Sequence, residues 1–239
     1  MKYFQLWFSD DPEEIGNRDG LGHGYLDDNF YRKNKWYEDI FINTPRQSKD
    51  WWKIWSQMPA HGQDLVEIKM HSKARHSDYI DFGNFREGFI VNKRLRSILE
   101  AANLPNHKFF QASFLQRKEL VTDYWWLTYD LELGASTVNF ASSEFDLSWH
   151  DANFDKPFKI SSYEDYLAIF YKTGRAVRAT KLVFTSAFNQ DLDIWGTQFL
   201  LVRKAYISER LLSEMREKGI TGYRILEPDC PLIFTEDQL

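Results

Sequence analysis

The stretch from Glu144 to Asp155 (EFDLSWHDANFD) alternates acids with aromatic residues and contains no lysine or arginine. Aromatic rings supply area that a partner can bury, and acidic groups speed association with a basic partner. The pattern therefore predicts part of a protein-binding surface, although a surface loop whose rings turn inward would give the same pattern. The residues expected to contact the partner are Glu144, Asp146, Trp149, Asp151 and Asp155.

A basic block without acids lies between Tyr171 and Lys181, and it consists of Lys172, Arg175, Arg178 and Lys181. Such a block suits the phosphate backbone of a nucleic acid, but cations near the end of a predicted helix are also stabilised by the helix dipole. The whole chain has 30 basic and 35 acidic residues and a formal charge of −5. Because net negative charge opposes broad nucleic-acid binding, we interpret the block as a solvated face.

Histidines and carboxylates do not fall at the spacings typical of a metal site. His71 and His76, with Asp78 and Asp81 nearby, are five residues apart and so do not share a helix face as the ligands of a zinc protease do. Lys73 and Arg75 lie between the two histidines and would repel a cation. We therefore expect neither a metal nor a cofactor.

The sequence also lacks the motifs of an activated nucleophile. His150 and Asp151 could form part of a catalytic triad, but no Gly-x-Ser-x-Gly elbow supplies the nucleophile. Cys230 follows Asp229, whose negative charge opposes formation of a thiolate, so we interpret this cysteine as structural. One alternative remains an enzyme whose site brings His23 and His150 together with loop acids from distant segments.

The chain has 239 residues, of which 43% are hydrophobic and 17% are aromatic, a composition that excludes a disordered chain. We expect a single compact unit over residues 1–239, with an aromatic-rich N-terminal part in residues 1–80. The single cysteine excludes an intramolecular disulfide and is typical of a reducing compartment. No apolar run approaches the roughly 20 residues that span a membrane, so we expect a cytoplasmic protein.

Strand-like and helix-like patterns follow each other without a regular rhythm, which favours an α+β fold with mixed or antiparallel sheets. The expected strands are Met1–Phe8, Leu65–Met70, His107–Leu115, Val121–Leu133, Thr180–Phe184, Asp193–Arg203 and Tyr223–Leu226. The expected helices are Ser48–Met58, Lys93–Ala102 and Ser162–Lys172. Residues 9–34 are expected to form a long irregular segment.

One short pattern occurs twice, at an offset of 116 residues. Each copy has a short strand, a polar helix cap, a three-turn amphipathic helix and a residue suited to a left-handed stop. The matched positions are Val91 and Ile207, Asn92 and Ser208, Arg94 and Arg210, Leu95 and Leu211, and Asn103 and Gly219. The pattern predicts two related strand–cap–helix–strand halves, with coincidence between two ordinary capped helices as the alternative.

Gly88–Leu95 (GFIVNKRL), Asp123–Leu127 (DYWWL) and the ending from Ile207 to Arg224 carry a resemblance. They resemble a family of bacterial immunity proteins, the antitoxins of polymorphic-toxin systems, which was long catalogued as a domain of unknown function. The resemblance covers about residues 82–226 and makes residues 81–239 the immunity-like part. The N-terminal part departs from the family pattern in its tryptophan content.

The resemblance implies a role without catalysis. Such proteins bind a cognate toxin domain and block its active site or its fold, so the implied partner is a protein. No catalytic residue and no cofactor are implied, and the matching positions look like scaffold. Neither a membrane nor a nucleic acid is an expected partner, and the sequence does not indicate an oligomeric state.

Overall fold

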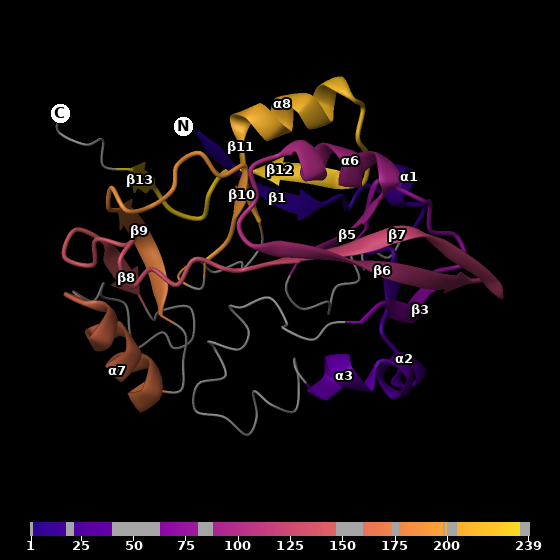
Figure 1. Ribbon diagram of the computed structural model, residues 1–239, viewed down its shortest axis with the longest axis horizontal. Helices are drawn as coiled ribbons and strands as arrows, with labels where there is room; N and C mark the ends of the chain where they lie inside the picture. Colours follow the sequence, from indigo (N-terminus) through magenta and orange to yellow (C-terminus); the bar gives the residue numbers. More distant parts are fainter. Residues whose placement is uncertain are drawn as a thin grey trace.

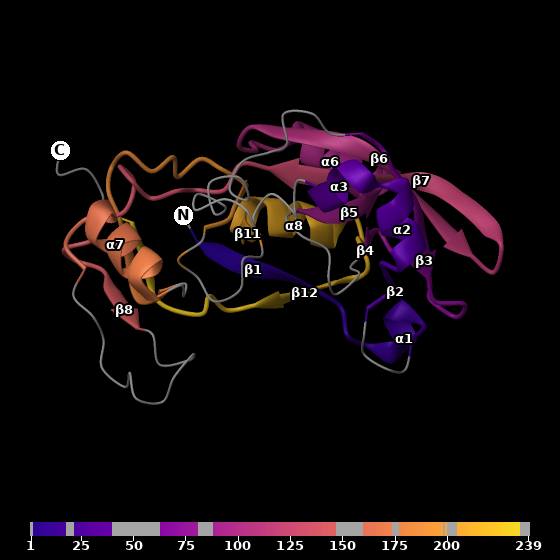
Figure 2. The ribbon, with the colours of Figure 1, turned by 90° about the horizontal axis from the view of Figure 1, so that it is seen from below.

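The computed structural model describes residues 2–17, 22–39, 63–80, 88–146, 160–173, 177–197, 199 and 205–234. Within them the chain forms three β-sheets with short helices packed against them, so the predicted α+β class is confirmed. A six-stranded sheet lies at one end of the molecule and a three-stranded sheet at the other, with a four-stranded sheet between them (Figures 1 and 2).

The six-stranded sheet has the strand order β2-β3-β6-β7-β5-β4. Its strands are β2 (Gly24–Tyr25), β3 (Leu65–Met70), β4 (Tyr79–Ile80), β5 (Phe89–Asn92), β6 (His107–Gln116) and β7 (Glu119–Tyr129). Helix α6 (Lys93–Ala101) covers one face, and α2 (Asp28–Lys33) with α3 (Lys35–Glu38) covers the other (Figure 1). Because neighbouring strand residues face opposite sides, Leu127 of β7 joins the core beneath α6 and Trp126 joins the core beside α3.

Helix α6 forms where the sequence supplies both a cap and an apolar stripe. The carboxamide oxygen of Asn92 accepts hydrogen bonds from the backbone N–H groups of Arg94 and Leu95 at 3.0 and 3.1 Å. Leu95, Ile98 and Leu99 follow at helical spacing, and all three are buried against the sheet.

The four-stranded sheet has the order β10-β11-β1-β12. Its strands are β1 (Tyr3–Phe8), β10 (Ile194–Trp195), β11 (Tyr206–Ser208) and β12 (Tyr223–Leu226). The N-terminal strand β1 occupies an inner position and is antiparallel to both neighbours. Helix α8 (Glu209–Glu217) begins at Ser208, whose hydroxyl accepts a hydrogen bond from the backbone N–H of Leu211 at 3.1 Å.

The three-stranded sheet contains β8 (Glu144–Asp146), β9 (Arg178–Phe184) and β13 (Leu232–Phe234), and α7 (Tyr163–Thr173) lies at the same end of the molecule (Figure 1). A core of aromatic rings joins this sheet to the four-stranded one. Trp195 stacks on Tyr206 with ring centroids 4.7 Å apart and meets Phe184 edge-on at 5.3 Å. Such pairs bury large apolar areas in a fixed geometry.

The expectation that residues 9–34 form an irregular segment is wrong, because they contain α1 (Pro12–Ile15), β2 and α2. Asp11 and Asp27 each begin a helix, since their carboxylates accept a hydrogen bond from a backbone N–H of the first turn. The helix expected over Ser48–Met58 lies outside the described residues.

Two expected boundaries also differ. In the described part of the strand expected over Asp193–Arg203, β10 ends at Trp195, and the carbonyl of Gly196 accepts a hydrogen bond from the backbone N–H of Glu132. Residues 198 and 200–203 of this strand lie outside the described residues. Helix α6 ends at an extended Ala102 rather than at a left-handed Asn103.

The predicted repeat is confirmed in the strand pairings. The first half consists of β4, β5, α6, β6 and β7, and the second half of β10, β11, α8, β12 and β1. Equivalent pairs are Tyr79↔Val91 with Ile194↔Ile207, Val91↔Trp125 with Ile207↔Phe4, and Phe109↔Leu127 with Ile225↔Leu6. The N-terminal strand β1 therefore takes in the second half the place that β7 takes in the first.

Candidate protein-binding surface

The described part of the predicted acidic surface lies on β8. Glu144 is exposed, whereas Asp146 is 9% exposed and the ring of Phe145 between them is fully buried. On this strand the aromatic side chain turns inward, as the alternative interpretation of the run expected. Trp149, Asp151 and Asp155 lie outside the described residues.

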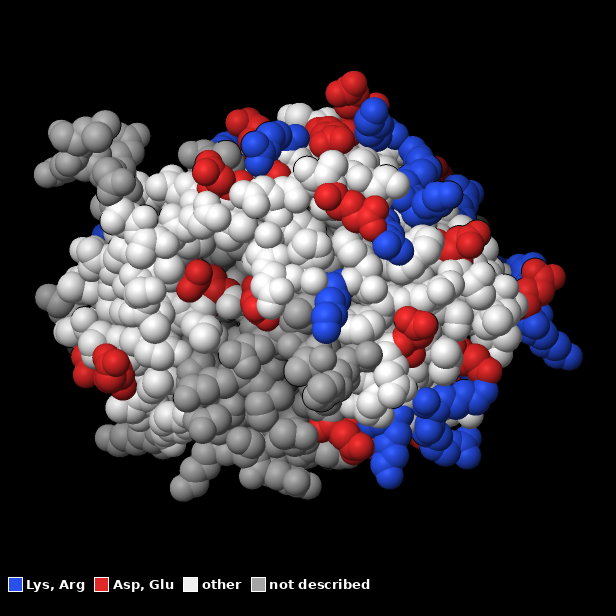
Figure 3. Space-filling model, in the orientation of Figure 1, with Lys and Arg blue, Asp and Glu red and all other residues white. Residues whose placement is uncertain are grey.

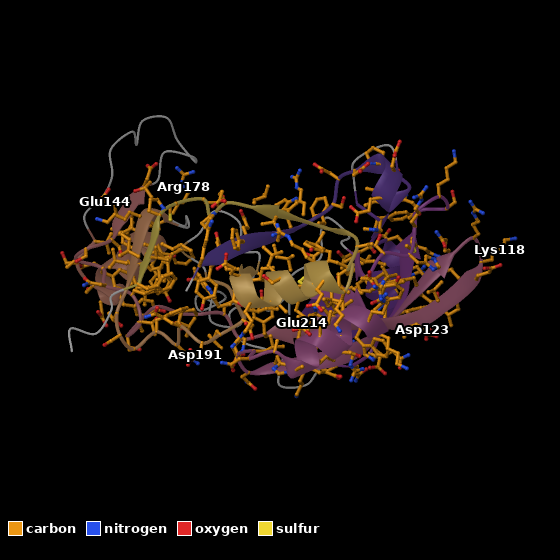
Figure 4. All side chains as sticks on the ribbon, turned by 90° about the horizontal axis from the view of Figure 1, so that it is seen from above. Lys118, Asp123, Glu144, Arg178, Asp191 and Glu214 are labelled. Atoms are coloured by element: carbon orange, nitrogen blue, oxygen red, sulfur yellow. The ribbon has the colours of Figure 1, made fainter. Side chains whose placement is uncertain are left out.

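The predicted basic block pairs with these acids across β8 and β9. A carboxylate oxygen of Asp146 lies 3.6 Å from a guanidinium nitrogen of Arg178, and one of Glu144 lies 3.4 Å from Nζ of Lys181. Figure 4 labels Glu144 and Arg178 at this end of the molecule. Partly exposed pairs contribute about 0–1 kcal/mol, so their main effect is to cancel charge. Arg175 and the side chain of Lys172 lie outside the described part.

The histidines considered for catalysis or metal binding are engaged separately. His23 is buried with its Nε2 3.2 Å from Oγ of Ser77, and Nε2 of His76 lies 2.8 Å from Oε1 of Gln116. His150 lies outside the described residues. Within the described ranges, no group of three or more His, Cys, Asp or Glu side chains is placed to hold a metal ion.

Cys230 is buried next to the strand β13. Burial, with a further contribution from the Asp229 carboxylate, raises the pKa of the Cys230 thiol to about 11. The thiol is therefore protonated at neutral pH, which agrees with the structural role expected from the sequence.

Asp78, considered with the histidines as a metal ligand, instead joins the two halves of the fold. In its own half, its buried carboxylate accepts hydrogen bonds from the Arg94 guanidinium at 3.1 Å and the Asn92 carboxamide at 2.7 Å. In the other half, Thr221 after α8 donates from its backbone N–H at 2.8 Å and from its hydroxyl at 2.9 Å.

Asp193 makes the equivalent connection from the second half of the fold to the first. The Arg210 guanidinium donates at 2.8 and 3.0 Å and the Ser208 hydroxyl at 2.5 Å, both from its own half. The backbone N–H of Asn103, after α6, donates at 2.9 Å. Burial alone would raise the pKa of Asp193, but these hydrogen bonds outweigh it and hold the pKa below its usual value. Each half thus donates hydrogen bonds to a buried aspartate of the other half.

The β6–β7 hairpin is a second candidate surface, and it extends beyond the rest of the six-stranded sheet (Figure 1), to the end where Figure 4 labels Lys118. Along Glu119–Asp123 both faces of β7 are open to solvent except for half-buried Val121. Leu120 is 59% exposed, more than any other large hydrophobic side chain in the described part of the chain. On the face shown in Figure 3, lysines and arginines gather toward this end of the molecule.

Sequence reasoning passed over this hairpin end, because it placed strands on either side and left the turn between them unassigned. The available signal was the run Gln116–Leu120 (QRKEL), a short loop with charged residues in place of the usual glycine or asparagine.

Comparison with known proteins assigns no relative: no protein-family model and no curated protein sequence matches the chain. None of the helices formed by the described residues has the length and apolar character required to cross a lipid bilayer.

Proposed function

We propose that this chain is an immunity protein that binds and blocks a cognate bacterial toxin domain without making or breaking bonds. The partner class comes from the family resemblance over about residues 82–226. The observation that carries the proposal is the projecting end of the β6–β7 hairpin (Figure 1), where the side chains of Arg117, Lys118 and Leu120 are exposed. A projecting element with charged and apolar groups suits contact with another protein.

The two packed halves that carry the hairpin support this role, because their arrangement is fixed before a partner binds. Asp78 and Asp193 tie the two halves together through buried hydrogen bonds. The hydroxyl of Tyr124 in β7 donates to the carbonyl of Ser77 at 2.9 Å, which connects the hairpin to the Asp78 contacts. A preformed binding element loses less conformational entropy on association, and this favours the tight binding that toxin inhibition requires.

The acidic run between Glu144 and Asp155 stays a proposed contact region. Glu144 is exposed, so its carboxylate is accessible to a partner. Asp146 is buried beside Arg178, and we assign it to positioning β8. A toxin domain that used both surfaces would present acidic groups to the hairpin and basic groups to this run.

Co-production in cells tests the proposal. If the neighbouring reading frame encodes a large protein with a C-terminal toxin module, that module is the probe, produced with and without this chain. We expect the module alone to arrest growth, co-production to restore growth, and the two purified proteins to elute as one complex. Arrest that persists while the chain is soluble and abundant would contradict the proposal. Restored growth without a complex would instead favour the enzymatic alternative.

A further inference from the structure

We infer that the turn Arg117–Lys118 at the end of the β6–β7 hairpin is the docking element of this protein and fits a concave, acid-lined site on a protein partner. The inference rests on the proposed function for the partner's class. It adds which surface makes the contact and what chemistry that surface meets.

Unusual backbone conformations gather at this hairpin. Among the described residues, three non-glycine residues have positive φ: Glu67 at 56°, Arg117 at 49° and Lys118 at 76°. Side chains disfavour this left-handed region because Cβ approaches the following carbonyl oxygen. Glu67 lies in β3, the strand that pairs with β6, and the other two residues form the turn. Arg117 and Lys118 are thus two adjacent residues in this region, and such residues are typical of functional sites.

The residues of the turn are not the types that its backbone geometry favours. Gln116 and Glu119 are the last paired residues, so Arg117 and Lys118 form a two-residue loop. Positive φ at both central positions is what a type I′ turn requires, and Asn-Gly is the sequence that suits this turn. The chain has two long cationic side chains there instead. Folding stability therefore does not account for these residue types.

Two β-bulges below the turn fix the direction in which it projects. The register between β6 and β7 shifts at Ser113, and the register between β3 and β6 shifts next to Glu67. The backbone N–H of Glu67 donates to the Ser113 hydroxyl at 3.2 Å, which links the two irregularities. Because bulges bend and twist a two-stranded ribbon, this junction aims the turn away from the sheet.

Within the part of the chain that the structure describes, the charge on the turn is not used. No ion pair or side-chain hydrogen bond joins Arg117 or Lys118 to another described residue, whereas Arg94 and Arg210 each hold a buried carboxylate. Lys69 of β3 pairs in register with Leu115, two residues before the turn, and adds a third cation at this end. A carboxylate-lined site would satisfy the Arg117 guanidinium in a bidentate way and the Lys118 ammonium as a point charge.

The residues after the turn favour a protein over a nucleic acid. Leu120 is 59% exposed, and its apolar side chain gains from burial against protein side chains. A narrow convex turn also reaches few phosphates, whereas it can enter a concave protein site.

The double variant Arg117→Asn/Lys118→Gly tests the inference, because it should move stability and binding in opposite directions. The favoured turn sequence should raise Tm by about 2 °C or more. Loss of both cations should slow association with the purified toxin module about tenfold at low salt, with a smaller effect at high salt. The matched control is Arg216→Gln/Lys218→Gln, which removes the same charge from exposed positions at the end of α8 and should leave the rate within about twofold.

The outcomes separate this inference from the proposed function. If the wild-type chain does not bind the module, the proposed function fails and this inference with it. If the wild type binds and the double variant associates at the same rate, the hairpin inference alone is overturned. An equal slowing by the control variant would also overturn it, since net charge and not the turn would then be responsible.

A second variant and a second probe address the partner's class. Leu120→Ser should speed dissociation of the module about tenfold, because an apolar contact mainly sets the off-rate. A mixed-sequence DNA duplex should bind neither wild type nor double variant at moderate salt. Salt-sensitive binding of the duplex by the wild type that is lost in the double variant would overturn the inference and assign the turn to nucleic acid.

Discussion

Asp193 receives hydrogen bonds from both halves of the fold, and only part of this arrangement is visible in the sequence. Ser208 and Arg210 lie in the predicted cap and first helical turn, so their places near a helix start were expected. The bond from Asn103, 90 residues away, depends on how the two halves pack. Local spacing carries no information about such a contact, and this is why the sequence did not mark Asp193 as a structural residue.

Asp193 should make the stability of the protein depend on pH below neutrality. Because the folded-state pKa of Asp193 is lowered, its stabilising contribution is complete above the unfolded-state value of about 3.9 and is lost as pH falls through the folded-state value. Asp193→Asn should lower the free energy of unfolding by about 2–3 kcal/mol at neutral pH and flatten the decline below about pH 4. Urea unfolding across this range measures both effects. The exposed neighbour Asp191, changed to Asn, is the control, and an equal acid decline in both variants would contradict the prediction.

Glu144 and Asp146, the two described acids of β8, should have different roles. Glu144 is exposed, so Glu144→Gln combined with Asp151→Asn and Asp155→Asn should slow toxin association at low salt and leave Tm nearly unchanged. Asp146→Asn should act on folding, lowering the free energy of unfolding by about 1 kcal/mol, because Asp146 is buried beside Arg178. Association rates and urea unfolding distinguish them, and an unchanged rate in the triple variant would remove this region from the binding surface.

At the scale of elements, the sequence predicts structure best where the residues that determine an element are close together in the chain. The helices after Asn92 and Ser208 were predicted because the cap and the apolar stripe lie within a few residues of each other. The short elements in residues 9–34 were missed because α1 and α2 are too short to show helical periodicity. Their remaining signal was a capping acid before each helix, at Asp11 and Asp27.

The repeat allows a sharper prediction for the cap of α6. Asn92→Ala removes a helix cap and a donor to Asp78, so we expect a loss of about 1–2 kcal/mol in the free energy of unfolding. Asn92→Ser should cost less than half of this, because Ser208 shows that a serine at the equivalent position caps the helix and also donates to the buried carboxylate. Thermal and urea unfolding of both variants provide the comparison. Equal losses would mean that the two caps are not equivalent.

At the scale of the whole molecule, the repeat is more complete than its sequence signature. The hydroxyl of Tyr124 in β7 donates to the carbonyl before Asp78 at 2.9 Å, and the hydroxyl of Tyr3 in β1 donates to the carbonyl before Asp193 at 3.0 Å. A constant offset of 116 residues matches the helix units but cannot match these strands, because one follows its half in the chain and the other precedes it. The sequence therefore predicted two related halves and not the strand that completes the second.

A circular permutant tests the assignment of β1 to the second half. The rings of Tyr3 and Phe234 lie 5.4 Å apart, so a short glycine–serine linker can join Phe234 to Lys2, and new ends can be opened between Asp10 and Asp11. The permuted chain places β1 after β12, with β13 between them, so that β1 follows its half as β7 does in the first half. It should fold with an unchanged circular dichroism spectrum and a cooperative melt. Deleting residues 1–8 should instead prevent folding, because an inner strand with the buried Leu6 is lost. A deletion variant that melts cooperatively while the permutant does not would show that β1 belongs to the connection into α1 and not to the repeated unit.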